Sequence, residues 1–229
     1  GVSADEAVLR RALRKGCISR GIVPVFCGSA FKNKGIQRLL DGVVDYLPSP
    51  NDIEQPLAAR SEAFERQESG GAEVSDEDKV RVSSEESDGF VGLAFKLMAD
   101  PYVGQLTFVR IYSGKMVSGQ TVMNTNKRRR ERVGRLLLMH ANKREEVSEV
   151  HAGEIVAVLG LKSTVTGDTL CDESVNVVME SMSFPEPVIN MAIEPETQDD
   201  VNRLGIALQK LAAEDPSFKV HSDKETGQT

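Results

Sequence analysis

The sequence predicts a multidomain, mainly β fold, and three observations support this prediction. Near the N-terminus, an apolar run, a loop and an amphipathic helix indicate the closing βα unit of an α/β domain. A central region of short apolar runs separated by turn dipeptides is typical of a closed β-barrel. A strand–helix–strand pattern near the C-terminus is half of a split βαβ domain. The expected divisions are 1–50, 51–89, 90–183 and 184–229.

The first region contains two expected helices around one expected strand. A helix over 3–15 starts with Ser3 and Glu6 at capping-box spacing. Residues 22–26 form a continuous apolar run, which suits a strand covered on both faces. Apolar residues at helical spacing over 36–47, followed by prolines, predict the second helix. A βα unit needs neighbouring strands, so we expect the chain to be a piece of a larger protein.

Residues 51–89 are expected to be an acidic linker. They contain twelve acidic and four basic residues, a local charge of −8, whereas the whole chain carries −7. The remainder of the chain is therefore near +1, so the acidic total does not exclude a nucleic-acid partner. The linker has few large apolar residues and is expected to be mostly irregular, with an edge strand around 79–82.

The third region has at least six expected strands with turn signals between them, such as Ser113-Gly114 and Ser118-Gly119. This pattern predicts a complete barrel. The expected strands are 90–97, 106–112, 121–124, 131–140, 154–161 and 168–171.

The fourth region starts with a strand-like run over 188–193. Thr197 caps the next helix, whose apolar stripe ends before Asp215-Pro216. A further strand is expected from Phe218 to Val220. The second half of such a domain does not follow, so we expect an open edge here and self-association through it.

Composition excludes several classes of protein. No run reaches the roughly 18 apolar residues that a membrane span needs, and no secretion signal opens the chain. The three cysteines are widely spaced, which argues against a disulfide framework or a zinc site. The histidines are isolated, so no metal site is expected, and no pair of residues indicates a catalytic centre.

Seven strings in the same order resemble elongation factor G, the ribosomal translocase. Each would be weak alone, but together and in order they are specific to this family. The strings are CGSAFKNKG (27–35), LDGVVDYLPSP (40–50), LTFVRIYSGKMVSG (106–119), GRLLLMHANKREEV (134–147), GDTLCD (167–172), FPEPVINMAIEP (184–195) and ALQKLAAEDPSFKV (207–220).

The resemblance implies a function in GTP-driven movement of tRNA and mRNA through the ribosome. It implies the end of a Rossmann-like GTPase domain, the translation-factor β-barrel called domain II, and half of the ferredoxin-like domain III. The implied partners are rRNA and ribosomal proteins, with tRNA contacted indirectly and no membrane. The implied location is the bacterial cytoplasm or the matrix or stroma of an organelle.

The resemblance also implies that Gly28, Ser29 and Ala30 form the guanine side of a GTP site. Backbone N–H groups there can donate to the base, and small side chains allow close approach. A tight strand-to-helix turn is the alternative. The chain contains no GxxxxGK[ST] phosphate loop. GTP is therefore the cofactor of the parent protein, whereas this chain is expected to bind none and to be inactive, with no catalytic residue.

A basic cluster in the barrel is a candidate for RNA contact, because lysines and arginines bind phosphates with release of counterions. The alternative is a solvated hairpin tip. The candidates are Lys127, Arg128, Arg129, Arg130 and Arg132, with Arg135 nearby. Two other functions stay open: a stand-alone RNA-binding β-barrel protein, and a sibling translational GTPase such as a ribosome-protection or release factor.

Overall fold

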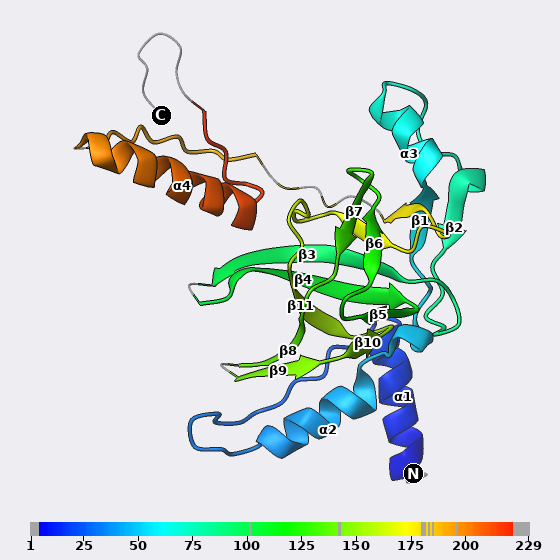
Figure 1. The fold of residues 1–229 in the computed structure, drawn as a ribbon. Helices are drawn as coiled ribbons and strands as arrows, with labels where there is room; N and C mark the ends of the chain where they lie inside the picture. Colours follow the sequence, from blue (N-terminus) through cyan, green and yellow to red (C-terminus); the bar gives the residue numbers. More distant parts are fainter. Residues whose placement is uncertain are drawn as a thin grey trace. The chain divides into compact units, whose positions relative to one another are not determined.

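The computed structural model describes residues 5–100, 102–141, 143–179, 182, 184, 186–195 and 197–221. The chain divides into two compact units, Gly1–Gln55 and Pro56–Thr229, which are described separately here. Thirteen strands and few helices lie in the described residues, and eight of the strands form one antiparallel sheet (Figure 1). The predicted mainly β fold is confirmed. No helix in these residues is long and apolar enough to cross a membrane.

The first unit contains the helices α1 (Glu6–Ile18) and α2 (Ile36–Tyr46) and a short 3-10 turn, Pro50–Asp52. Arg14 of α1 joins them: its guanidinium donates to the Leu47 carbonyl at 3.2 Å and forms an ion pair with Asp52 at 2.6 Å. Both predicted helices are confirmed, although Ser3, the expected cap of α1, lies outside the described residues.

The predicted strand over 22–26 is wrong. The backbone from Ile22 to Gly28 belongs to no strand, and the side chains of Val23 and Val25 are 80% and 84% exposed. The apolar run is of the kind that a central parallel strand needs, but a strand forms only when neighbours supply hydrogen bonds. The described part of this unit contains no such neighbour.

Residues 51–89 hold more regular structure than the sequence predicted. They contain β1 (Leu57–Arg60), α3 (Ser61–Glu68), a 3-10 turn (Asp76–Asp78) and β2 (Lys79–Arg81). The expected edge strand is confirmed as β2. The reason for the extra order is that β1 pairs with β13 (Val177–Met179), with Ala58 opposite Met179. The segment cannot build a core alone, so it adds to the core of the barrel.

The barrel strands follow one another in an eight-stranded antiparallel sheet, in the order β7-β6-β12-β3-β4-β11-β8-β9. A separate pair, β5 and β10, lies against the same region. The strand bounds are β3 Val91–Asp100, β4 Gly104–Ser113, β5 Lys115–Val117, β6 Thr121–Asn124, β7 Arg129–Arg132, β8 Leu136–His140, β9 Lys143–Val147, β10 Glu149–His151, β11 Ile155–Leu159 and β12 Thr169–Cys171.

Three residues between β7 and β8 close this sheet into a barrel. Val133 N donates to the Gln120 carbonyl at 2.9 Å, beside β6. Gly134 N donates to the Leu159 carbonyl at 2.9 Å, at the end of β11. The expected strand over 131–140 is therefore one chain run that bonds first to one end of the sheet and then to the other. The backbone groups of the link are satisfied, as a buried connection requires.

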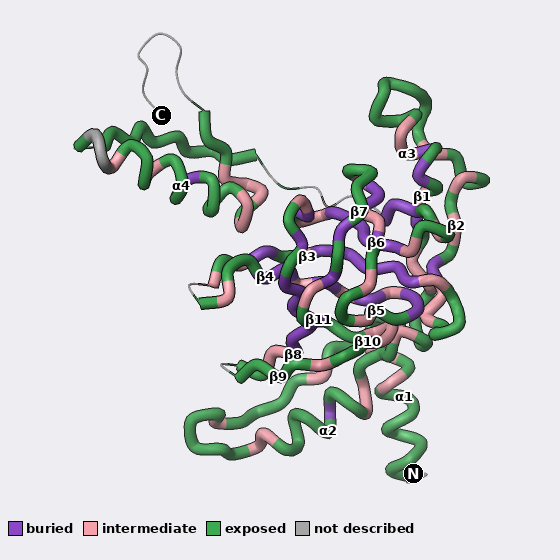
Figure 2. The backbone as a smooth tube through the Cα atoms, in the orientation of Figure 1, coloured by how far each residue is buried: buried purple, intermediate pink, exposed green. Residues whose placement is uncertain are grey.

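The barrel encloses the principal core, in which Phe90, Ile111, Leu136 and Leu170 are almost fully buried. A second cluster on its outer side joins Ala58 and Val82 of the acidic segment to barrel residues such as Val91 and Cys171. Figure 2 shows buried residues concentrated in the barrel strands, whereas α1, α2 and α4 are mostly exposed.

A buried carboxylate fastens the loop after β11 to β7. Glu131 is 7% exposed and accepts hydrogen bonds from Lys162 N at 2.5 Å and from the Thr164 hydroxyl at 2.6 Å. Ser163 donates to it through its N–H and its hydroxyl. Burial alone would raise the pKa of Glu131, but these hydrogen bonds outweigh it and hold the pKa below the ordinary value.

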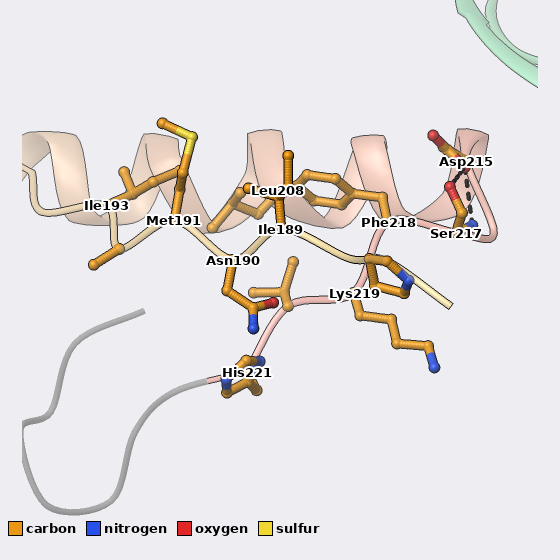
Figure 3. Close-up of a pocket in the computed structure, with 13 residues that line it drawn as sticks. Ile189, Asn190, Met191, Ile193, Leu208, Asp215, Ser217, Phe218, Lys219 and His221 are labelled. Atoms are coloured by element: carbon orange, nitrogen blue, oxygen red, sulfur yellow. Dashed lines mark hydrogen bonds between the residues drawn. The ribbon is translucent and has the colours of Figure 1, made fainter. Parts of the chain in front are cut away.

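The C-terminal region contains α4 (Gln198–Glu214), and Thr197 caps it by accepting from Asp200 N at 3.3 Å. The predicted helix and cap are thus confirmed. The predicted strands over 188–193 and 218–220 are wrong, since the described residues there are in no strand. Figure 3 shows both segments extended along α4, near Leu208. Extended backbone without a bonded neighbour is not a sheet, and the sequence could not supply that neighbour.

Replacement of Glu131 by Gln should destabilise the barrel by about 1–3 kcal/mol, since an amide turns two donors toward groups that already donate. Because the folded-state pKa of Glu131 is lowered, its stabilisation is present above the unfolded pKa and is lost as pH falls through the folded value. The wild type should therefore lose more stability than E131Q between pH 6 and pH 3 in urea titrations.

The control is Glu173→Gln, since Glu173 forms an exposed ion pair with Arg130. This variant should change the free energy of unfolding by less than about 1 kcal/mol. Equal effects of E131Q and E173Q at pH 7 would contradict the structural role of Glu131.

Replacement of Gly134 by Ala should destabilise the barrel by at least about 1–3 kcal/mol, because overpacking forces the backbone to shift. A Cβ on Gly134 would lie 2.3 Å from the Leu159 carbonyl oxygen, at the link that closes the sheet. Gly205→Ala is the matched control, because Gly205 lies within α4 with nothing within 4 Å of such a Cβ. That change should be neutral or slightly stabilising. Thermal unfolding of both variants is the measurement, and an unchanged midpoint for G134A would refute the argument.

Candidate functional site

The loop with the predicted nucleotide-binding residues is a tight turn. Ser29 N donates to the Lys34 carbonyl and Lys34 N to the Ser29 carbonyl, each at 3.0 Å. Gly28 lies against this bridge, since a Cβ there would be 2.7 Å from the Lys34 carbonyl oxygen. Gly35, at φ 78°, then starts α2. The loop therefore needs its glycines for close approach of backbone to backbone.

This geometry changes which groups of the loop can bind a base. The Ser29 N–H is engaged by Lys34, so it is not available as the structure stands. The Ala30 N–H forms no hydrogen bond within the described residues, and Ala30 is exposed. The role of Gly28, Ser29 and Ala30 in nucleotide binding stays a prediction, and Ala30 is its best-placed donor.

The basic cluster lies on the hairpin between β6 and β7 and on β7 itself. Lys127 is directed toward the barrel: its Nζ donates to the Ser163 carbonyl and lies 3.2 Å from the buried carboxylate of Asp168. Asp168 also accepts from Asn124 Nδ2 at 2.8 Å. Lys127 is therefore part of the internal polar network, and its charge is compensated.

Two arginines of the cluster form surface ion pairs. Arg128 Nε lies 2.7 Å from a carboxylate oxygen of Glu65 on α3. Arg130 binds Glu173 through two nitrogens, one of them at 3.0 Å. Exposed pairs of this kind are weak, so a phosphate can compete with them. Their presence nevertheless reduces the positive charge that the sequence alone indicated.

Arg129 and Arg132 are the cations of the cluster that remain available. Both are exposed, and neither forms an ion pair within the part of the chain that the structure describes. Arg135 lies 3.7 Å from Glu146, a loose contact at the surface. Of the five predicted RNA-contact residues, the structure thus separates three with acidic partners from two without.

Sequence reasoning missed a second exposed group, at the turn between β3 and β4. Asp100 Oδ1 accepts from Tyr102 N at 2.9 Å and from Val103 N at 3.0 Å. These bonds hold the turn so that Tyr102 is 89% exposed. The backbone hydrogen bonds to Asp100 are the chief cause that lowers the pKa of its carboxyl, so it stays charged at neutral pH. The Asp-Pro-Tyr-Val-Gly sequence indicated a turn, but not which side chain it presents.

The described residues contain no group of three His, Cys, Asp or Glu side chains that could hold a metal ion. Burial raises the pKa of the Cys171 thiol, which lies in the second core cluster and is poorly suited to act as a nucleophile. His140 and His151 lie at the surface beside glutamates. These residues have structural roles, and the candidate sites are the loop over 27–35 and the two exposed barrel surfaces.

Comparison with known proteins matches two successive parts of the chain to the same family. The model of elongation factor G domain 2 matches residues 89–173, and that of elongation factor G domain III matches residues 184–229. A crystal structure of a protein from Thermus thermophilus superimposes with a TM-score of 0.68 and 25% sequence identity. That match covers 99% of this chain and 30% of the Thermus chain, so the chain spans about a third of its length.

The barrel observed between β3 and β12 coincides with the first match, and the α4 region lies within the second. Two different domains of one protein type, in consecutive order, are far more specific than either domain alone, because the barrel by itself occurs in proteins of many functions. The chain belongs to the elongation factor G family.

Proposed function

We propose that this chain acts as part of a translational GTPase that moves tRNA and mRNA through the ribosome in the cytoplasm or an organelle matrix or stroma. The observation that carries the proposal is the succession of elongation factor G domains 2 and III along one chain. The two sibling functions are less favoured for the same reason. A stand-alone RNA-binding barrel would not need the domain III sequence, and both family models carry the name of this factor.

The barrel is the part proposed to contact the ribosome. Arg129 and Arg132 are exposed and lack acidic partners among the described residues, so phosphate oxygens can bind them without loss of an existing ion pair. Arg128 and Arg130 could join only by exchanging Glu65 and Glu173 for phosphate. The interaction would therefore depend on salt and would rest mainly on two side chains.

The loop over 27–35 is proposed to contribute the guanine side of the parent's GTP site. Its support is the free Ala30 N–H and the close backbone packing at Gly28. Both α2 and the loop expose apolar side chains, such as Val44 and Phe31. This is the expected state of elements whose sheet neighbours would come from elsewhere in a GTPase domain.

Replacement of Arg129 and Arg132 together by Ala should weaken ribosome binding several-fold and lower the salt dependence of log K by about two units, one for each lost phosphate contact. Arg130→Ala should have a smaller effect, because Arg130 is paired with Glu173. The exposed Arg38 on α2 is the control, and R38A should bind as the wild type does. Equal affinity and equal salt slope for the double variant and the wild type would refute the proposed contact.

This chain alone should show no measurable GTP binding, because a base contact without a phosphate loop supplies little of the affinity. Isothermal calorimetry with GTP and Mg²⁺ checks this, with ATP as the control nucleotide. Micromolar binding of GTP would show that the loop over 27–35 is a larger part of the site than we propose.

A further inference from the structure

The β3–β4 hairpin ends in an exposed aromatic side chain on a rigid turn. The two strands stay paired to their last residues, with Asp100 opposite Gly104. The carboxylate of Asp100, whose side chain is 7% exposed, then binds Tyr102 N and Val103 N. Because the backbone of the turn is fixed before any partner arrives, binding through Tyr102 costs little additional ordering.

A positive charge lies beside this turn. Arg144 of β9 binds the Asp100 carboxylate, so the tips of the β3–β4 and β8–β9 hairpins are tied together. Lys143 is exposed at the start of β9, opposite His140, and Arg144 retains a third of its side-chain exposure. Glu145 lies 3.7 Å from His140, so the acid at this tip lies nearest the histidine.

An exposed aromatic ring is otherwise unfavourable at a protein surface, and Tyr102 is more exposed than any barrel side chain of comparable size. A flat ring flanked by lysine and arginine fits an unpaired nucleic-acid base, which stacks on the ring while the cations bind the adjoining phosphates. We propose that Tyr102, with Lys143 and Arg144, is a stacking site for an unpaired base of single-stranded RNA.

This inference rests on the proposed function in one respect: it names a ribosomal RNA base as the natural occupant. The surface differs from the basic cluster of β7. There the binding is by charge alone, whereas here the turn supplies a ring face, and the two surfaces involve different strands.

The test uses a short single-stranded RNA in which one uridine is replaced by 5-iodouridine, which cross-links to an aromatic ring in contact with the base. The cross-link should map to Tyr102. Tyr102→Leu should abolish it and lower the affinity for the RNA between about five- and a hundred-fold. Tyr102→Phe should retain the affinity within about two-fold. Since Tyr102 is 89% exposed, neither change should alter the thermal midpoint.

Ribosome binding by the same variants separates this inference from the proposed function. If the wild type and Y102L bind ribosomes equally and no cross-link forms at Tyr102, the stacking site is refuted and the proposed function stands. If no variant binds ribosomes but the RNA cross-link maps to Tyr102, the stacking site stands and the ribosomal function is refuted. Double-stranded RNA should not compete, because its bases are not accessible for stacking; competition by it would count against the site.

Discussion

The closure of the barrel by Val133, Gly134 and Arg135 is the constraint on which the remaining structure depends. The backbone of these residues bonds to Gln120 on one side and to Leu159 on the other, and thereby removes both edges that an open sheet would leave. Without closure, the core around Phe90, Ile111 and Leu170 would be open along one side. The close approach requires glycine at position 134.

The polar network under β7 connects this closure to the candidate RNA surface. Glu131 and Asp168 lie inside the barrel end, where they hold the loop over 162–164 and the side chains of Asn124 and Lys127. Arg130 and Arg132 point away from the core on either side of Glu131, because neighbouring residues of a strand face opposite ways. The acid inside therefore positions the bases outside, which explains one glutamate within a run of basic residues.

Much of the barrel could be predicted from sequence, because its signals are local. Turn dipeptides such as Ser113-Gly114 separate runs that pair with nearby runs, and the predicted strands were found with shifted ends. The run over 22–26 failed because strand formation depends on neighbours that local sequence does not show. The acidic segment failed for the opposite reason: β1 finds its partner in β13, at the far end of the barrel sequence, and composition does not reveal such a pairing.

The candidate site could be predicted only as a set of residue types. The cluster from Lys127 to Arg132 was evident, but Glu65 and Glu173 lie far away in sequence, so their pairing with Arg128 and Arg130 was not. Tyr102 escaped notice because exposure is a property of the folded turn. Its direction depends on the side chain of Asp100, which could equally have pointed to solvent.

The three-stranded sheet β13-β1-β2 has a consequence for what counts as a domain here. The match to domain 2 starts at residue 89, yet Ala58 and Val82 lie in one core cluster with Val91, Leu93 and Met179. Inheritance and folding thus draw different borders: the ancestral module begins where β3 begins, whereas the cooperative unit extends back to Pro56. An acidic stretch outside the shared module has become part of what keeps that module dry.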